Sequence, residues 1–217
     1  MNDATIIYVS SNKETPEFEA KTRKNLTDNC GNLPIISVTH KPVPLGRNIV
    51  VGDVGASGFN FCRQLLMACE AADTRFVISA ESDCIYPAEY FTFRPDRDDK
   101  CYRNTNLYIL PYKKNYFQKK DSSTFAQVIN REYYIKRLKE LFGDAPQWSV
   151  EEKNFPKERN KRSGLFHGDE YRLFATEYAC ISFKTGLGMR KTTGHHPGEY
   201  LEIPYWGSAE KIRKEYL

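Results

Sequence analysis

The sequence predicts an α/β fold with a central sheet whose strands are mostly parallel. Short apolar runs rich in β-branched residues occupy residues 5–9, 35–39 and 76–80, and such runs are typical of buried strands. Segments of helical spacing lie between them, and this alternation favours parallel pairing through right-handed crossovers. The second half of the chain contains more loop and fewer clear helices, so we expect a more irregular arrangement there.

Length and composition limit the class of protein. The 217 residues suit a single domain, whose two halves we expect to meet near residue 110. Charged residues make up 28% and hydrophobic residues 40% of the chain, as is ordinary for a soluble globular protein. A net charge of +4 gives no electrostatic reason to expect a nucleic-acid partner. No apolar run approaches the roughly 20 residues that a membrane span requires.

The amino terminus and the cysteines favour a reducing, cytoplasmic location. A strand-like segment begins by Thr5, which leaves no space for the basic and apolar regions of a secretory signal. The six cysteines include no CxxC pair and show no disulfide-framework spacing. Cys62 and Cys69 share one face of a predicted helix, where we expect them to act as small core residues. A cytoplasmic location is the expectation that follows.

Two helices are predicted in the first half. Residues 16–26 alternate charged and apolar side chains and indicate a surface helix. Ser57 suits the N-cap of the second helix, with Asn60 at its third position. The glycines of residues 52–58 match no phosphate-binding loop, and residues 49–51 suggest a short strand before them. The buried face of the second helix is predicted to consist of Phe59, Cys62, Leu65, Leu66, Cys69 and Ala72.

A long helix dominates the prediction for the second half. Ser122 or Ser123 is its predicted cap and Gly143 its end. Its apolar side would consist of Phe125, Val128, Ile129, Ile135, Leu138, Leu141 and Phe142. The other elements expected there are a loop at residues 91–99, a strand at 106–110, a charged loop at 151–163, a helical turn at 167–170, a strand at 179–183 and a terminal helix capped by Ser208.

An acidic pair follows the predicted strand of residues 76–80. If the chain stays extended, Glu81 and Asp83 project from one face, because strand side chains alternate with a period of two. Two neighbouring carboxylates repel each other unless a cation or donor cluster lies between them. Ligands of α/β sheets bind beyond the carboxyl ends of the strands. The pair is therefore a candidate divalent-metal site, and the alternative is a turn whose acids cap the next segment.

Three other features are candidates for ligand binding. The polar loop of residues 10–13 follows the first strand, as in many nucleotide sites. Arg63 falls off the buried face of its helix and is either a solvated arginine or a contact to an anion. His195 and His196 lie in a Gly/Pro-containing loop, which is either ordinary surface or a source of imidazole. Carboxylate together with imidazole suits Mn²⁺ or Mg²⁺ better than a structural zinc.

The order of these features resembles the GT-A class of nucleotide-sugar glycosyltransferases, and within it viral capsid-glycan transferases. The shared order is a first strand with a polar loop, an arginine-bearing helix, VISAESD with an aromatic-proline turn, and a basic glycine-rich loop with histidines. The class carries a D-x-D motif at a strand end, whereas this chain has Glu81 in the first position and Asp83 in the second. The resemblance covers most of residues 4–200. It implies a Rossmann-like mixed sheet flanked by helices, with residues 1–110 on the nucleotide-sugar side and 111–217 on the acceptor side.

The resemblance also implies roles for individual residues. Asp83 and a histidine, for which we favour His195 over His196, would bind Mn²⁺ or Mg²⁺. An inverting enzyme would need a general base, which Asp169 or Glu170 would supply, although a helix N-cap is the simpler role for Asp169. The residues expected to contact the donor are Ser10, Asn12, Arg63, Glu81, Ser82 and Lys191.

The implied function is a metal-dependent transfer of a hexose-type sugar from a UDP-sugar to a glycan or protein-linked acceptor, in the host cytoplasm if the protein is viral. One alternative is a sugar-phosphate nucleotidyltransferase, but such enzymes usually open with a GxGxRxxP-type loop that SSNKETPEF lacks. The other alternative is a non-catalytic carbohydrate- or nucleic-acid-binding module. The 14 tyrosines would suit that module, but it would leave the acidic pair unexplained.

Overall fold

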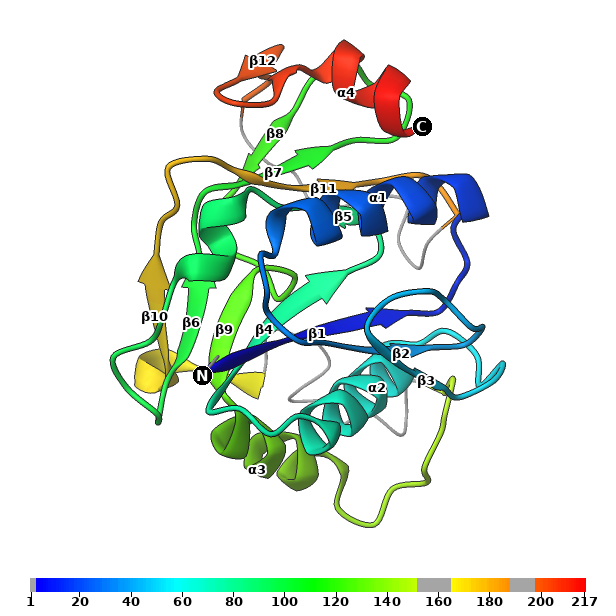
Figure 1. Cartoon of the computed structure of the whole chain (residues 1–217), viewed down its shortest axis with the longest axis vertical. Helices are drawn as coiled ribbons and strands as arrows, with labels where there is room; N and C mark the ends of the chain where they lie inside the picture. Colours follow the sequence, from blue (N-terminus) through cyan, green and yellow to red (C-terminus); the bar gives the residue numbers. More distant parts are fainter. Residues whose placement is uncertain (1–2, 152–164, 188–197) are drawn as a thin grey trace.

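The computed structural model describes residues 3–151, 165–187 and 198–217, which form a mixed α/β fold (Figure 1). Its main sheet is seven-stranded, in the order β10-β6-β9-β4-β1-β2-β3. In chain order these strands are β1 (Ala4–Ser10), β2 (Ile35–Thr39), β3 (Arg47–Val50), β4 (Phe76–Glu81), β6 (Cys101–Asn104), β9 (Gln127–Asn130) and β10 (Tyr171–Phe174). The helices are α1 (Pro16–Asn29), α2 (Gly58–Ala71), α3 (Arg131–Phe142) and α4 (Ala209–Tyr216), with 3-10 turns η1 (Ala88–Thr92) and η5 (Gly168–Glu170).

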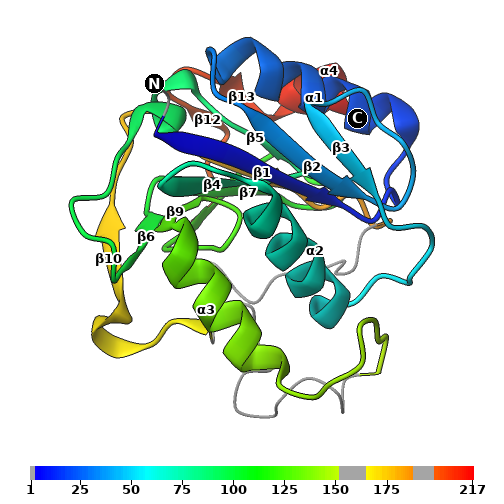
Figure 2. The same cartoon turned by 60° about the horizontal axis from the view of Figure 1, so that its bottom comes forward.

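The first half of the chain builds the parallel part of the sheet. β1 pairs in parallel with β2 and with β4, and β2 pairs in parallel with β3. Helices cover both faces, with α2 and α3 on one side and α1 on the other (Figure 2). Ile7 and Val9 therefore pack against α2 and α3, while Ile6 and Tyr8 point to the opposite cluster with α1. Burial on both faces explains why β1 is apolar throughout, and the predicted fold class is confirmed.

A second, four-stranded sheet is built from short strands that lie between residues 84 and 183. Its strands are β5 (Cys84–Ile85), β7 (Leu107–Leu110), β8 (Gln118–Lys120) and β11 (Cys180–Phe183). Helix α4 packs in the same core as this sheet, together with the hairpin of β12 (Glu202–Ile203) and β13 (Gly207–Ser208). Phe18 of α1 meets Phe183 of β11 edge to face, with ring centroids 5.3 Å apart. α1 thus contributes to the cores of both sheets, through Leu26 on one side and Phe18 on the other.

Several predicted helix ends are confirmed. Ser57 Oγ accepts a hydrogen bond from the Asn60 amide at 3.0 Å, and Ser208 Oγ accepts from the Lys211 amide at 3.2 Å. Gly143 ends α3 with φ 47°, a left-handed conformation that glycine adopts without penalty. The six cysteines are buried and unpaired, so Cys62 and Cys69 are the core residues that their spacing predicts.

The predicted start of the long helix is wrong. Residues 127–130 form β9, which pairs antiparallel with both β4 and β6, and the helix begins only at Arg131. Val128 and Ile129 fit a helical spacing, but they are β-branched residues buried in the sheet, where such side chains pack well. Asn130 is the true cap. β6 was not predicted, and β3 lies at 47–50 rather than at the expected 49–51.

Within the described residues, no helix has both the length and the apolar character needed to cross a membrane.

The cap of α3 can be tested by mutation. Asn130 Oδ1 accepts a hydrogen bond from the Tyr133 amide at 3.0 Å. Asn130→Ala should lower the free energy of unfolding by about 1 kcal/mol, because one amide at the start of the helix loses its acceptor. Ser122→Ala, at the cap predicted from the sequence, is the control and should change it by less than about 0.5 kcal/mol. Urea unfolding measures both changes in free energy. A larger loss in Ser122→Ala than in Asn130→Ala would place the start of the helix near Ser122, as the sequence pattern predicted.

Candidate functional site

The carboxyl ends of β1 and β4 lie side by side because these strands pair in parallel with Val9 opposite Glu81. The loops that follow the two strands therefore meet at one edge of the sheet. A cavity of about 420 Å³ opens there. Its lining comes from both sheets and from the start of α2, and includes Ser10, Ser11, Lys13, Glu14, Ala56, Ser57, Phe61, Gln64, Glu81, Ser82, Asp83, Lys120, Ser122, Ser123, Thr124, Ser182, Lys184 and Thr185.

The acidic pair lies in this cavity, although the strand does not continue through it. β4 ends at Glu81, and Ser82 and Asp83 form a turn that leads into β5. The prediction that both carboxylates project from an extended strand is thus wrong in its backbone geometry. The turn nevertheless places Glu81, Ser82 and Asp83 together on the cavity wall.

Among the described residues, the contacts of the Asp83 carboxylate are long. Ser182 Oγ lies 3.5 Å and Lys184 Nζ 3.6 Å from Asp83 Oδ2, and Cys84 Sγ lies 3.4 Å from Oδ1. Hydroxyl-to-carboxylate hydrogen bonds are normally 2.5–2.7 Å. The side chain of Asp83 is 25% exposed. This carboxylate is therefore open to a further ligand, as a hard oxygen donor suited to Mn²⁺ or Mg²⁺ must be.

A complete set of metal ligands cannot be assembled from the described residues. Within them, no three His, Cys, Asp or Glu side chains are grouped so as to hold a metal ion. The predicted second ligand, His195, and its alternative His196 lie outside the described residues, as does Lys191. Asp83 fits a cation, and the remaining ligands would have to come from those residues or from a bound substrate.

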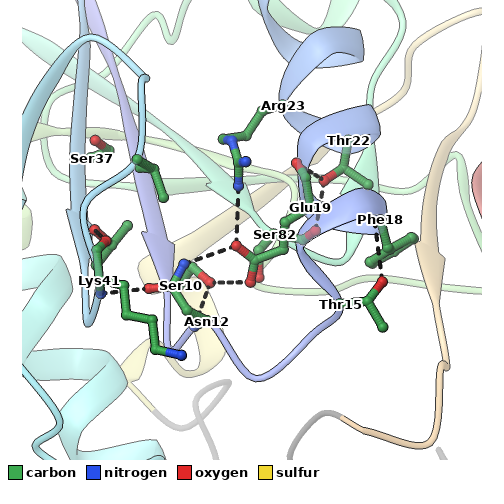
Figure 3. Close-up of polar contacts among 12 residues, drawn as sticks. Ser10, Asn12, Thr15, Phe18, Glu19, Thr22, Arg23, Ser37, Lys41 and Ser82 are labelled. Carbon is green, nitrogen blue, oxygen red and sulfur yellow. Dashed lines mark hydrogen bonds and ion pairs between the residues drawn. The ribbon is translucent and has the colours of Figure 1, made fainter.

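Ser10 and Asn12 are held by a buried carboxylate (Figure 3). Ser10 Oγ donates to Glu19 Oε1 at 2.8 Å and accepts from the Asn12 amide at 2.9 Å. Asn12 Nδ2 donates to Glu19 Oε2 at 2.9 Å, and Arg23 Nη1 lies 3.1 Å from the same oxygen. Asn12 Oδ1 accepts from the Lys41 amide at 2.8 Å. These two predicted donor-binding side chains therefore shape the loop after β1, and of the two only Ser10 lines the cavity.

The same face of α1 also holds the loop after β4. Thr22 Oγ1 donates to the carbonyl oxygen of Ser82 at 2.9 Å, and Asn25 Oδ1 accepts from the Tyr86 amide at 2.8 Å. Glu19, Thr22 and Asn25 are spaced three residues apart, so they lie on one side of the helix. One polar face of α1 thus positions both strand-end loops (Figure 3).

Arg63 does not reach the cavity, contrary to prediction. Its Nη2 donates to the carbonyl oxygens of Ala145 and Pro146 at 3.0 and 2.8 Å. Its guanidinium carbon lies 3.7 Å from the centre of the Phe142 ring, and burial lowers its pKa. These contacts direct the side chain to the end of α3, where it anchors the following loop.

Asp169 and Glu170 also lie outside the cavity lining. Asp169 Oδ2 is 3.3 Å from the buried ammonium of Lys100, and Glu170 is 3.0 Å from Arg137. Glu170 also accepts from the His167 amide at 2.8 Å, and His167 rather than Asp169 caps the turn. The structure assigns these acids to ion pairs and turn geometry, so neither contacts the proposed substrate pocket.

Three charged residues of the cavity were not singled out from the sequence: Glu14, Lys120 and Lys184. Burial raises the pKa of Glu14, and the charge of Asp83 raises it further. Burial lowers the pKa of Lys120. Lys184 directly follows a strand, so the rule applied to Glu81 could have found it. Lys120 ends the polar strand β8, whose sequence carries no apolar pattern to reveal it.

Solved structures resemble this chain in fold. A glycosyltransferase involved in the glycosylation of the major capsid of PBCV-1 matches with a TM-score of 0.50 and 12% identity, over 83% of this chain and 93% of that one. Residues 1–349 of TarS from S. aureus match with a TM-score of 0.50 and 9% identity, over 84% and 61%. The mannosyltransferase PcManGT from Pyrobaculum calidifontis, in complex with GDP-Man and Mn²⁺, matches with a TM-score of 0.46 and 13% identity, over 83% and 56%.

No family model matches the sequence, and no curated protein sequence matches it. At 9–12% identity, the two matches with a TM-score of 0.50 show the fold alone, and they agree with the GT-A-type, Rossmann-like α/β class predicted from the sequence. The chain spans between 50% and 61% of the length of several matched chains, including TarS and the mannosyltransferase.

The importance of Glu19 for the fold can be measured. Its side chain is 4% exposed and is compensated by Arg23. Glu19→Ala should lower the free energy of unfolding by about 3 kcal/mol, because the Arg23 charge loses its buried partner. Glu17→Ala, an exposed glutamate on the same helix, is the control, with an expected change under about 0.5 kcal/mol. Equal effects of the two variants in urea unfolding would refute a special role for Glu19.

Proposed function

We propose that this protein is a glycosyltransferase that moves a hexose-type sugar from a UDP-sugar to a glycan or protein-linked acceptor. The observation that carries the proposal is the acidic turn of Glu81, Ser82 and Asp83 in a cavity at the carboxyl ends of two parallel strands. This edge is where α/β sheets bind nucleotides. The fold shared with the PBCV-1 capsid glycosyltransferase supports the same conclusion at the level of architecture.

A divalent cation, Mn²⁺ or Mg²⁺, is part of the proposal. Asp83 would hold it, with His195 as the second protein ligand and His196 as the alternative. The bound cation would supply positive charge to stabilise the diphosphate leaving group. The long contacts around Asp83 support this role, because they leave its carboxylate available.

The surrounding residues would bind and orient the donor. Glu81 and Ser82 lie on the cavity wall and are proposed to contact the ribose side of the nucleotide. Ser10 lines the cavity and would border the donor, whereas Asn12 would act through the loop that both side chains hold against Glu19. Lys191 remains proposed beside the diphosphate. A general base, if the reaction inverts configuration, would come from the cavity carboxylates rather than from Asp169.

Donor class is tested by thermal stability. A UDP-sugar with Mn²⁺ at about 100 times its dissociation constant should stabilise the native state by about 2.7 kcal/mol. For a chain of this size that corresponds to a rise in Tm of roughly 5–10 °C. Differential scanning fluorimetry with UDP-, GDP- and dTDP-sugars measures it, and mass spectrometry would then detect released UDP and glycosylated acceptor. No shift with any nucleotide would favour a non-catalytic module, and pyrophosphate release from UTP and a sugar phosphate would favour a nucleotidyltransferase.

The metal assignment is tested at Asp83. Asp83→Asn should remove the Mn²⁺-dependent part of UDP-sugar binding, because the amide is neutral and a weak ligand for hard cations. Its apo Tm should stay near that of the wild type, since partly exposed ion pairs contribute little. Asp28→Asn on the outer surface of α1 is the matched control and should leave binding unchanged. Calorimetric titration with and without Mn²⁺ measures this, and unchanged affinity in Asp83→Asn would exclude Asp83 as a ligand.

A further inference from the structure

Two lysines from the second sheet enter the same cavity. Lys120 is the last residue of β8, and Lys184 directly follows β11. Both line the cavity that also contains the acidic turn. Lys120 pairs with Leu107 at the start of β7, whereas the Lys184 amide donates to the Leu110 carbonyl oxygen at its end, and both lysines line the cavity. Neither residue belongs to the acidic motif or to the histidine loop.

The Lys120 ammonium has weak compensation among its described contacts. Its Nζ donates to the neutral hydroxyl of Ser123 at 3.0 Å and lies 5.9 Å from the centre of the Phe125 ring. Burial and the positive charge of Lys184 lower the pKa of Lys120 more than Glu81 and Asp83 raise it. A half-buried ammonium in such surroundings is stabilised by an anion that enters the cavity.

Lys184 is only partly neutralised by Asp83. Its Nζ donates to Ser182 Oγ at 3.2 Å and lies 3.6 Å from Asp83 Oδ2, beyond normal hydrogen-bond distance. An ammonium carries three N–H donors, so these contacts leave donor capacity directed at the cavity. The two lysines also repel each other, and an anion placed between them would remove that repulsion.

Hydroxyl groups surround the two ammonium groups. Ser122, Ser123 and Thr124 follow β8, and Thr185 follows Lys184, and all four line the cavity. Lysine ammonium and hydroxyl donors are the groups that bind phosphate oxygens in proteins. This combination fits a multiply charged oxyanion better than it fits a neutral sugar.

We infer that Lys120 and Lys184 form an anion subsite that binds a diphosphate group without requiring a metal ion. The identification of this group as the diphosphate of a nucleotide-sugar donor rests on the proposed function. Lys184 lies beside Asp83, and Lys120 belongs to a different strand, so the subsite would contact phosphate oxygens in addition to those held by a cation at Asp83.

Binding of inorganic pyrophosphate in the presence of EDTA tests the inference. Isothermal titration should show binding to the wild type, and Lys120→Met and Lys184→Met should each weaken it at least tenfold. Lys119→Met is the matched control, because Lys119 neighbours Lys120 on β8 but does not line the cavity. The Lys119 Nζ donates to Asn106 Oδ1 at 3.0 Å and lies over the ring of Tyr108. Lys119→Met should leave affinity unchanged. Met is similar in length and apolar, so Lys120→Met should keep or raise the Tm, which verifies folding.

UDP and uridine in EDTA separate this inference from the proposed function. UDP affinity should fall in the two lysine variants by the same factor as pyrophosphate affinity, while uridine affinity stays constant. If the variants lose pyrophosphate binding but the wild type binds no UDP-sugar even with Mn²⁺, the subsite is retained and the proposed donor is refuted. UDP-sugar binding that is equal in wild type and variants would retain the function and refute the subsite. Absence of pyrophosphate binding by the wild type would also refute it.

Discussion

The parallel pairing of β1 with β4 is the constraint on which the site depends. Because Val9 lies opposite Glu81, the two strands end together, and the loops after them share one edge of the sheet. Parallel strands buried on both faces must be covered by helices, and α1 and α2 supply that cover. The same helices then lie beside the loops and can position them. The location of the cavity is therefore a consequence of topology rather than of any single polar contact.

The buried carboxylate of Glu19 fixes the conformation of the loop that follows β1. Glu19 would be unfavourable in the interior alone, but Arg23, Ser10 and Asn12 together supply donors to both of its oxygens. Because these donors come from the helix and from the loop, the loop cannot move without exposing or orphaning the carboxylate. Thr22 extends the same restraint to Ser82. The loops after β1 and β4 in the proposed donor site are thus held to α1 by hydrogen bonds.

Features encoded locally could be predicted from the sequence, and features set by distant contacts could not. The apolar runs at 5–9, 35–39 and 76–80, with the polar residues at their ends, predicted the parallel sheet and the acidic wall of the cavity. Val128 and Ile129 fit a helical pattern, and only pairing with β4 and β6 makes them a strand. Arg63 carries no sequence signal for its stacking on Phe142.

The surroundings of Asp169 also depend on a distant residue. Its exposed side chain pairs with Lys100, and it does not line the cavity. The missed cavity lysines belong to the second sheet, whose position depends on α1: Phe18 packs on Phe183, one residue before Lys184. Glu81 and Asp83 lie at the end of a strand of the first sheet, and Lys120 and Lys184 lie at the ends of strands of the second, so both sheets contribute charged side chains to the cavity. A diphosphate that binds a cation at Asp83 would match both kinds of charge, and α1 packs against both of the sheets that supply them.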